Sequence, residues 1–544
     1  MTPTRFMTLR EAIETVPDGA LLTFGGFDLQ RPPLALAAEL VRQGRRKLRV
    51  VVPPTPLPLD LLVGAGAVAE AEFGFIGFQY ERGFVVAPNV RRAVESGTIA
   101  WRERDVFEIA QGLRAAAHGV DYLPAPGGEG TDYDWIWPAP RARVSTDDTV
   151  SAIAPAIRPD AVLLHAQAAD RLGNLYLADP YFEDLLSRAG ERVIASVETV
   201  VDRLPQVTIP ATRVTAVVEA RGGAWPGGCH GYYRHSEAGL AAWDEAARAG
   251  RFAAHLETFI RDRAEGRHQG GPEAAVGAEP GPAAAAASPR VAAGASSHIT
   301  AGATGPADRL IVGMARRIAD GDTVVTGLAS ALPMLAVAVA RATHAPRLTY
   351  INCVGAVDPV VDRALSTSVD PRLLEGAAAR LLVTDFFDLA RRGRIDLMFF
   401  GAAQVDAAAR MNLSCIGDPL HPKVKLPGPA GSTSIRPYVR KVVVLVPRHA
   451  ARVLVERVDF ASSVSSARNR ETWVVSDLAL LRLEGERLRL VSRHAGVEAA
   501  ALAGKTGFAL DAPADPGPTA EPNAAERAAI ERLDPTGLRH VLAG

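Results

Sequence analysis

Two glycine-rich loops in this sequence have a composition suited to binding an anion or a carbonyl oxygen. In the first, Gly25, Gly26 and Phe27 directly follow the short apolar run ALLTF. A glycine turn at the end of a strand lets the backbone approach a ligand closely and point free N–H groups at it. The second loop, LPGPAGSTS, contains Gly428, Gly431 and Ser432. We expect both loops to bind a ligand; the alternative for each is a tight connection with no ligand.

Other polar clusters have simpler structural explanations. His165 lies in the apolar run AVLLHAQ, where we expect a hydrogen-bonded core histidine rather than a base. Asp170 follows in HAQAADRLGN and is expected to hold the next turn through side-chain-to-backbone hydrogen bonds. The string CHGYYRH brings Cys229 close to two histidines, which are zinc-ligand types. Because no second cluster accompanies it, we expect no metal site.

Common catalytic signatures and extreme charge are both missing from the sequence. It has no G-x-x-x-x-G-K-[ST] loop, no full G-x-G-x-x-G fingerprint and no G-x-S-x-G elbow. The net charge of −1 offers no bulk field for nucleic acid or anionic lipid. The three cysteines are far apart and odd in number, which is not a disulfide framework. With no apolar run of the ~18 residues that span a bilayer, we expect a cytoplasmic protein.

The elements that must position these loops occur twice. PDGALLTFGGF precedes a helical stretch and RVVV, and ADGDTVVTGLA precedes a similar stretch and TYIN. Each copy predicts a strand, a small-residue loop, a helix and a second strand, with equal spans from Pro33 to Leu48 and from Pro333 to Leu348. Further apolar runs, from RVIASVE in the first half to RLLVTDF and VVVLVP in the second, are also read as strands.

An Ala/Gly/Pro-rich stretch divides the chain. We predict one domain over 1–265, a flexible linker over 266–307, a second domain over 308–510 and a tail over 511–544 that ends in a short charged helix. Strand-like runs that alternate with helical stretches predict an α/β class. We therefore expect two related, open, mostly parallel α/β domains.

Several strings in both halves resemble the family I CoA-transferases. The first half is similar to the A subunit through TFGGFDLQRPP, FVVAPNVRRAVESGTI and RPDAVLLHAQAADRLGNLYLADP. The second half is similar to the B subunit through GAAQVDAAARMNLSCIGD, LPGPAGSTS and KVVVLVPRHAARVLVERVDFAS. The resemblance implies a fused A–B protein of CoA-transferase fold that acts on an acyl-CoA thioester. For such a protein we expect the glycine loops to bind the substrate and Gln404 to orient its acyl part. Basic residues such as Lys423 and Lys425 could meet the CoA phosphates; the alternative for each is plain surface charge.

The family's nucleophile is a glutamate in the B half, and this sequence lacks it. In the family the glutamate follows the second strand of the repeat in a Glu-Ser-Gly or Glu-Asn-Gly pattern. Here the segment reads HAPRLTYINCVGAVDP, with Cys353 in the place of the glutamate. The sequence has no glutamate between Arg347 and Glu375. One interpretation is that the Cys353 thiolate replaces the carboxylate, since a thiolate is a good nucleophile. The alternative is a small buried hydrophobe.

A second interpretation follows the ring-opening acyl-CoA hydrolases, a family branch that lacks this glutamate and relies on an acid of the A half. The string TIAWRERDVFEIAQGL offers Glu103, Asp105 and Glu108, of which Glu103 is the first choice. Such a carboxylate could activate water or take a proton next to a thioester. The simpler explanation is a charged helix entrance with Asp105 near the N-cap.

Three functions therefore stay open: CoA transfer, acyl-CoA or carbon–carbon hydrolysis, and binding of a CoA ester without catalysis. We expect coenzyme A as a substrate moiety, no other cofactor and no metal. Neither nucleic acid nor a membrane is expected as a partner, and a homo-oligomer is compatible with the sequence.

Overall fold

The computed structural model describes residues 5–80, 83–125, 128–138, 140–143, 150–264, 304–511 and 516–543. Their contacts divide the chain into two units. Unit 1 comprises Met1–Ala283 together with Ser414–Gly431, and unit 2 comprises Ala284–Leu413 and Ser432–Gly544. A segment of the second half thus folds with the first. The domain boundaries drawn from the sequence stay a prediction. The predicted linker lies outside the described residues except for 304–307, of which Pro306 and Ala307 begin a helix.

Unit 1 is built on a nine-stranded sheet of order β1-β14-β13-β11-β2-β3-β4-β7, with β12 paired to β11. All neighbours on this path are parallel. The strands are β1 (Arg5–Phe6), β2 (Leu21–Phe24), β3 (Leu48–Val52), β4 (Val68–Phe73), β7 (Ala100–Glu103), β11 (Ala161–Asp170), β12 (Leu175–Tyr176), β13 (Arg192–Val201) and β14 (Ala216–Glu219). Smaller sheets contain β5 (Gly77–Tyr80) and β6 (Gly83–Val86); β8 (Tyr122–Pro124), β9 (Arg141–Arg143) and β10 (Val150–Pro155); and β22 (Cys415–Ile416) and β23 (Val424–Lys425).

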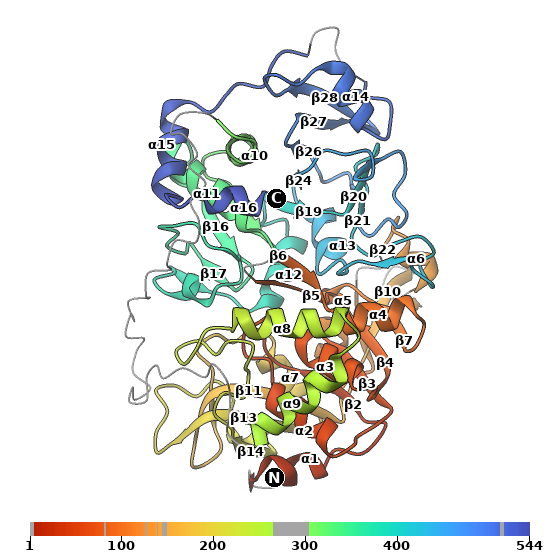
Figure 1. Cartoon of the computed structure of the whole chain (residues 1–544), viewed down its shortest axis with the longest axis vertical. Helices are drawn as coiled ribbons and strands as arrows, with labels where there is room; N and C mark the ends of the chain where they lie inside the picture. Colours follow the sequence, from red (N-terminus) through yellow and green to blue (C-terminus); the bar gives the residue numbers. More distant parts are fainter. Residues whose placement is uncertain are drawn as a thin grey trace. The chain divides into compact units, whose positions relative to one another are not determined.

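The helices of unit 1 cover both faces of this sheet. They are α1 (Leu9–Glu14), α2 (Leu34–Arg42), α3 (Pro56–Gly64), α4 (Pro88–Glu95), α5 (Val106–Ala117), α6 (Tyr133–Ile136), α7 (Glu183–Ala189), α8 (Glu237–Arg248) and α9 (Phe252–Ala264). Leu48, Val50 and Val52 of β3 join the large apolar core with side chains of α1–α4, α8 and α9. The ribbons of α2, α3 and α9, which contact one another, lie together in Figure 1. The helices α5 and α7 pack on each other, and α7 contacts β11.

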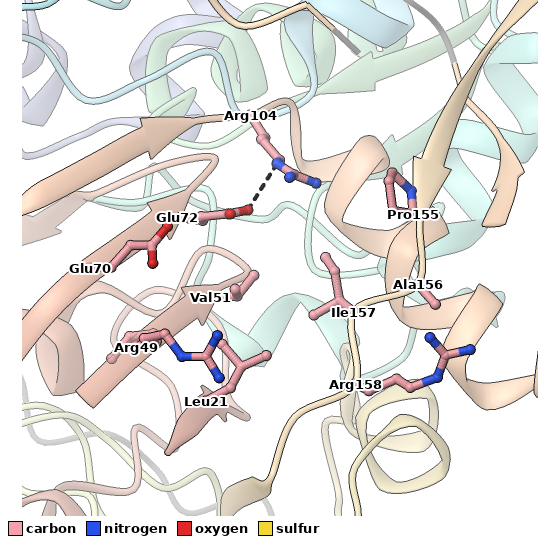
Figure 2. A pocket seen from close by; sticks show the side chains of 11 residues that line it. Leu21, Arg49, Val51, Glu70, Glu72, Arg104, Pro155, Ala156, Ile157 and Arg158 are labelled. Carbon is pink, nitrogen blue, oxygen red and sulfur yellow. Dashed lines mark ion pairs between the residues drawn. The ribbon is translucent and has the colours of Figure 1, made fainter. Parts of the chain in front are cut away.

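Side chains alternate between the two faces along a strand, and this alternation gives unit 1 a polar groove. Arg49 and Val51 of β3 and Glu70 and Glu72 of β4 line a pocket of about 200 Å³, opposite the core residues of the same strands (Figure 2). Arg104, which follows β7, pairs with Glu72 there at 2.9 Å. The groove therefore lies on the sheet face that the apolar core does not use.

Unit 2 has a nine-stranded sheet of order β18-β17-β16-β15-β19-β24-β26-β27-β28, parallel in its centre and antiparallel at both ends. Its strands are β15 (Thr323–Thr326), β16 (Thr349–Asn352), β17 (Ala356–Val357), β18 (Ala379–Arg380), β19 (Leu397–Gly401), β24 (Lys441–Val446), β26 (Glu471–Ser476), β27 (Ala479–Glu484) and β28 (Arg487–Arg493). A small sheet joins β20 (Gln404–Asp406), β21 (Met411–Asn412) and β25 (Leu454–Val455). Its helices are α10 (Pro306–Ala315), α11 (Ala331–Thr343), α12 (Val383–Arg391), α13 (Ser432–Ile435), α14 (Ala499–Lys505), α15 (Ala524–Leu533) and α16 (Leu538–Leu542).

The predicted repeat and fold class are confirmed. The parallel pair β2 and β3 is joined through α2, and the parallel pair β15 and β16 is joined through α11. The predicted charged helix of the tail is α15, whose Asn523 and Glu526 form a capping box. Its contacts with α11 make it part of unit 2. Among the described residues, no helix is long and apolar enough to cross a membrane.

One predicted strand is wrong. RLLVTDF forms α12 from Val383 onward rather than a strand. Its N-terminus is held by Asp385, whose carboxylate accepts from the backbone N–H of Leu382 at 2.8 Å. Phe386, Phe387 and Ala390 are buried, so the apolar residues follow a helical period. The run of β-branched and leucine residues at the start of the helix is what imitates a strand.

Candidate active site

The predicted ligand loop and the predicted acid lie at the same edge of the unit 1 sheet. Gly25 directly follows β2, and Glu103 is the last residue of β7. Parallel neighbours end at one edge, and open α/β sheets bind ligands outside the carboxyl ends of their strands. The strands β2 and β7 are separated by β3 and β4, which corresponds to about 14 Å at ~4.8 Å per strand.

Glu103 lies in a fully closed hydrogen-bond network. Its side chain is buried, with Oε1 accepting from the Tyr133 hydroxyl and Oε2 accepting from Lys425 Nζ. The Tyr133 oxygen also lies 2.7 Å from Ser414 Oγ. Burial raises the pKa of Tyr133 well above its ordinary value, and the charge of Glu103 adds to this shift. The phenol therefore stays protonated and can donate to the carboxylate.

Lys425 supplies the positive charge beside Glu103 and is not a surface residue. Its side chain is fully buried, and Nζ donates to the carbonyl oxygens of Ser414 and Leu426, both at 2.8 Å. The rings of Phe73 and Trp101 lie 5.5 and 5.4 Å from Nζ. These contacts correct the expectation that Lys425 meets a CoA phosphate.

The segment that carries Lys425 is tied to the ends of β4 and β7. The Ala430 N–H donates to the Gly74 carbonyl at 2.9 Å, and the Val106 N–H donates to the Ala430 carbonyl at 2.8 Å. Gly428 has φ +102°, and a Cβ there would lie 2.7 Å from the Gly74 oxygen and 3.3 Å from Glu103 Oε2. The close approach requires glycine, so Gly428 is needed to place backbone against the acid. A substrate contact for Gly428 and Gly431 stays a prediction.

The two other acids of the predicted cluster have different positions. Asp105 caps α5, accepting from the Phe107 N–H at 2.8 Å, as the helix-entrance explanation predicts. Glu108 lies 3.5 Å from Arg104. Burial raises its pKa, and Arg104 opposes the shift. Glu103 is the acid whose carboxylate pairs with Lys425 of the 414–431 segment.

The amides of the Gly25–Gly26 loop are already bonded within the protein. The Gly25 N–H donates to the Leu163 carbonyl at 2.9 Å, and the Gly26 N–H donates to Glu183 Oε1 at 3.0 Å. Phe27 stacks on Tyr181 with ring centroids 5.1 Å apart. This corrects the expectation of free N–H groups: the loop is held by packing, and a ligand would have to displace Glu183 to use the Gly26 amide.

A buried arginine, Arg31, bonds to Glu183, which also bonds to the Gly26 amide of this loop. Arg31 is fully buried, and its Nε donates to Asp179 Oδ1 at 2.6 Å while Nη2 pairs with Glu183 Oε1 at 2.6 Å. Its Nη1 donates to the His165 carbonyl at 2.9 Å. The single guanidinium thus contacts both carboxylates, so the positive charge of Arg31 is compensated within the protein.

Asp28 is a candidate that sequence reasoning missed. It is 3% exposed, has φ +54°, and its Oδ1 is buried with no hydrogen-bond partner among the described residues. Burial raises the pKa of this carboxyl to about 8, and a hydrogen bond from the Leu29 N–H opposes the shift. An uncharged carboxylic acid therefore follows the Gly-Gly-Phe turn at neutral pH. The sequence signal was an acid directly after the Gly-Gly-Phe turn.

The candidates in unit 2 are engaged in structural contacts. Cys353 follows β16, is 6% exposed, and its Sγ donates to the Ser368 carbonyl at 3.4 Å. Gln404 accepts at Oε1 from Asn412 at 2.7 Å and from the Asp459 N–H at 3.0 Å. Ser432 is buried, and its carbonyl accepts from the Ser463 hydroxyl at 3.0 Å. Their roles toward a substrate stay predictions.

His165 is the hydrogen-bonded core histidine that its apolar surroundings predict. It is fully buried, with Nδ1 2.9 Å from Ser196 Oγ and Nε2 2.7 Å from Glu198 Oε1. Ligand atoms of His165, Glu198 and Cys229 lie within 4.8 Å of one another, a spacing that a metal ion could use. Burial raises the pKa of the Cys229 thiol well above its ordinary value, and the charges of Glu198 and Asp179 add to this shift. Asp170 holds its turn as predicted, accepting from Leu172 and Asn174.

Comparison with known proteins identifies the family. The family model for coenzyme A transferases matches residues 6–220 and 308–497. The chain belongs to the coenzyme A transferase family. Counterparts of both subunit types are thus present in one polypeptide, and the protein is an enzyme of this family.

Two curated relatives cover the first half. The A subunit of the 3-oxoadipate CoA-transferase of Pseudomonas knackmussii is 32% identical over 267 residues, which is 47% of this chain and 93% of the relative. The cholesterol ring-cleaving hydrolase IpdA subunit of Rhodococcus jostii is 33% identical over 237 residues, 40% of this chain and 78% of the relative. The chain is thus similar both to transferases and to a hydrolase.

Solved structures show the same fold across both halves. The acyl-CoA transferase YdiF of Escherichia coli O157:H7 covers 96% of this chain and 97% of its own, with a TM-score of 0.67 and 17% identity. The decarboxylase AibA/AibB is 44% identical and covers 44% of this chain and 98% of its own, with a TM-score of 0.42. The YdiF likeness covers nearly the whole chain, as a CoA-transferase fold with both halves in one chain predicts.

Proposed function

We propose that this family enzyme is an acyl-CoA hydrolase that cleaves a carbon–carbon bond, with Glu103 as its base. The supporting observation is the buried Glu103 carboxylate, bonded to Lys425 and Tyr133 at the carboxyl edge of the sheet. The position of the family's nucleophilic glutamate holds Cys353, a buried thiol that donates to a carbonyl. The similarity to a ring-cleaving hydrolase subunit is consistent with such chemistry.

The geometry gives the two oxygens of Glu103 different tasks. Lys425 occupies Oε2, and its further bonds to two carbonyl oxygens fix its position. The Tyr133 hydroxyl bonds Oε1 but is 2.7 Å from Ser414 Oγ. Rotating that O–H toward Ser414 frees a lone pair of Oε1 without moving a heavy atom. Oε1 is therefore the oxygen that exchanges protons.

The proposed reaction uses a thioester with a carbonyl group one carbon beyond its α-carbon. Oε1 takes a proton from water, and the hydroxide adds to that carbonyl carbon. The adduct collapses to a carboxylic acid as its bond to the α-carbon breaks, and the electron pair becomes a thioester enolate. The enolate carbon then takes the proton back from Glu103. If the bond lies in a ring, the ring opens; the reaction needs no cofactor beyond the CoA moiety of the substrate.

Transfer of CoA between carboxylic acids is the second candidate, because the chain is 32% identical to a 3-oxoadipate CoA-transferase subunit. Transfer by a thiol requires that the thiol take the acyl group as a thioester and release CoA. The acyl group then passes to the acceptor carboxylate as a mixed anhydride, and the released CoA attacks the acceptor's carbonyl carbon and frees the first acid. Cys353 is the residue in the family's position, so this candidate predicts a covalent intermediate on its thiol. A protein that only binds CoA esters would show neither reaction.

One assay separates these functions. The full chain is incubated with a cyclic β-oxoacyl-CoA, with and without acetate, and the products and the protein mass are read by mass spectrometry. A hydrolase gives the ring-opened acyl-CoA without acetate, and its intact mass shows no acyl adduct that hydroxylamine removes. Formation of acetyl-CoA that depends on acetate would refute the hydrolase and support transfer. Tight binding without turnover would leave only the binding role.

Matched acid variants test the base. Glu103→Gln should lower kcat by about 10²- to 10⁴-fold, the range for loss of a general base. Asp105→Asn and Glu108→Gln change neighbouring acids, the one that caps α5 and the one that pairs with Arg104, and both variants should retain most activity. Equal losses in all three would show that the effect is structural. Full activity of Glu103→Gln would exclude Glu103 as the base.

A further inference from the structure

Unit 2 contains a second pocket that lies outside the sites considered so far. It has a volume of about 440 Å³ and lies between α10, the strands β27 and β28, and residues 518–522 of the C-terminal segment. Residues 517–519 run beside the end of β28, with the Thr519 N–H donating to the Arg493 carbonyl at 2.6 Å. The wall is therefore an ordered part of unit 2.

The pocket is basic on one side and apolar on the other. Its basic residues are Arg309, Arg316, Arg317 and His494, and Val312, Leu480 and Val491 contribute apolar surface. Val491 is 39% exposed, which is high for a valine on a strand. A ligand with an anionic end and an alkyl part matches this division.

Two of the arginines are already bonded to the C-terminal segment. Arg309 pairs with Glu521 at 3.0 Å, and Arg316 pairs with Glu526 at 2.7 Å. Arg316 also donates to the carbonyl oxygens of Ala520 and Glu521, at 2.6 and 3.0 Å. These contacts build the pocket wall, so these two guanidinium groups are not the ones that would receive a ligand.

Arg317 is differently placed. Its guanidinium carbon lies 4.2 Å from the centre of the Trp473 ring, and its Nε is buried with no hydrogen-bond partner among the described residues. Burial lowers the pKa of Arg317; Glu471 opposes this shift, while Arg316 and Arg482 add to it. An anion in the pocket would compensate this cluster of positive charge.

His494 adds an unused acceptor. It is 2% exposed, and its Nε2 lies 2.9 Å from the Ser476 carbonyl, which requires the proton on Nε2. Burial lowers the pKa of His494, so the ring is neutral and Nδ1 is an acceptor. Nδ1 is buried and has no partner in the part of the chain that the structure describes. A buried acceptor of this kind favours a ligand that brings a hydroxyl or an amine.

We propose that this pocket binds a small hydroxycarboxylate, with its carboxylate on Arg317, its hydroxyl on His494 Nδ1 and its alkyl part against Val312 and Val491. The site belongs to unit 2 and is independent of the reaction proposed for Glu103. Its ligand class follows from three features: Arg317 Nε and His494 Nδ1, which have no hydrogen-bond partner among the described residues, and the apolar wall.

Calorimetric titration of the full chain tests the ligand class. The probes are 3-hydroxybutyrate, butyrate and inorganic phosphate. 3-Hydroxybutyrate should bind about five- to tenfold more tightly than butyrate, the effect of one hydrogen bond to a buried acceptor. Phosphate binding as tight as 3-hydroxybutyrate would overturn the proposal, because neither the hydroxyl nor the alkyl part would then contribute.

Matched variants locate the site. Arg317→Met should weaken 3-hydroxybutyrate binding at least tenfold. Arg482→Met should change it less than twofold, because Arg482 lies over the same Trp473 ring, at 5.4 Å, but does not line the pocket. His494→Gln keeps a donor for the Ser476 carbonyl and should abolish the preference over butyrate. Glu103→Gln should bind as the unmodified protein does; equal losses in Arg482→Met or Glu103→Gln would place the ligand elsewhere.

A measurement on the unsubstituted protein keeps the test independent of folding defects. Phenylglyoxal modifies arginine side chains, and peptide mass spectrometry gives the rate for each. Modification of Arg317 should be slowed at least threefold by saturating 3-hydroxybutyrate, with no change at Arg482. Unchanged modification of Arg317 under saturating ligand would overturn the proposal.

Discussion

Replacing Asp28 by asparagine should remove a pH-dependent cost from the folded state. Asparagine has nearly the same shape as a protonated aspartate and also accepts the left-handed backbone at φ +54°. The buried carboxyl has a pKa of about 8, against an ordinary value of 3.8. Between these values the folded chain holds a proton that the unfolded chain has released.

The sign follows from proton linkage. Because the folded state binds the additional proton, the free energy of unfolding falls as pH rises from about 4 to about 8 and then levels off. One pKa unit corresponds to about 1.4 kcal/mol, so the wild type should lose about 2.7 kcal/mol relative to Asp28→Asn between pH 5 and pH 7. The contribution of the Asp28 proton is thus greatest in acid.

Urea unfolding followed by tryptophan fluorescence measures this difference. Five of the six tryptophans lie in unit 1, so the signal reports mainly the unit that contains Asp28. Asp121, which has an exposed side chain, supplies the control: Asp121→Asn should differ from wild type by the same amount at each pH. A difference between wild type and Asp28→Asn that stays constant from pH 5 to pH 7 would refute the reasoning.

Three other changes test the remaining buried groups. Lys425→Met should lower the free energy of unfolding by about 3–5 kcal/mol, because Glu103 would keep a buried charge without its lysine partner. The control is Lys423→Met at an exposed position, which should change this free energy by less than about 0.5 kcal/mol. Equal changes of the two variants in urea unfolding would contradict the pairing of Lys425 with Glu103. Arg31→Met should cost a similar 3–5 kcal/mol because two buried carboxylates lose their partner; an unchanged urea midpoint would exclude this. Cys353 should react with iodoacetamide far more slowly in the native protein than in urea, and equal rates would contradict its burial.

The elements that local patterns define were predictable. The strand β2, the helix α2 and the strand β3 follow from apolar runs separated by turn residues, and the second copy follows from the same phrase. Asp105 as a cap was predictable because it bonds to Phe107, two residues along the chain. The burial of His165 was predictable from the apolar run around it, although its partner Glu198 is 33 positions away. The strand predicted for RLLVTDF is wrong because its first residues fit both the two-residue period of a strand and the 3.6-residue period of a helix. Tertiary packing favours the helix.

The surroundings of Glu103 could not be read from the sequence. Its lysine partner is 322 positions away, in a VKLPG string that reads as an exposed loop. Tyr133 lies in a short helix within a stretch rich in glycine and aspartate. The hydrogen bond of the Gly26 amide could not be predicted for a similar reason, since its acceptor Glu183 is 157 residues away in the sequence. Long-range pairing of single polar side chains has no local signature.

The inclusion of residues 414–431 in unit 1 has a consequence for the order of synthesis. Lys425 leaves the ribosome 322 residues after Glu103, a delay of about 15 to 65 s at ~5–20 residues per second. During that interval the nascent first half contains an acid whose counterion has not yet been made. Unit 1 therefore cannot complete its fold until residues 414–431 have been synthesised. A gene split within residues 265–303 would yield a first fragment that requires the second to become native.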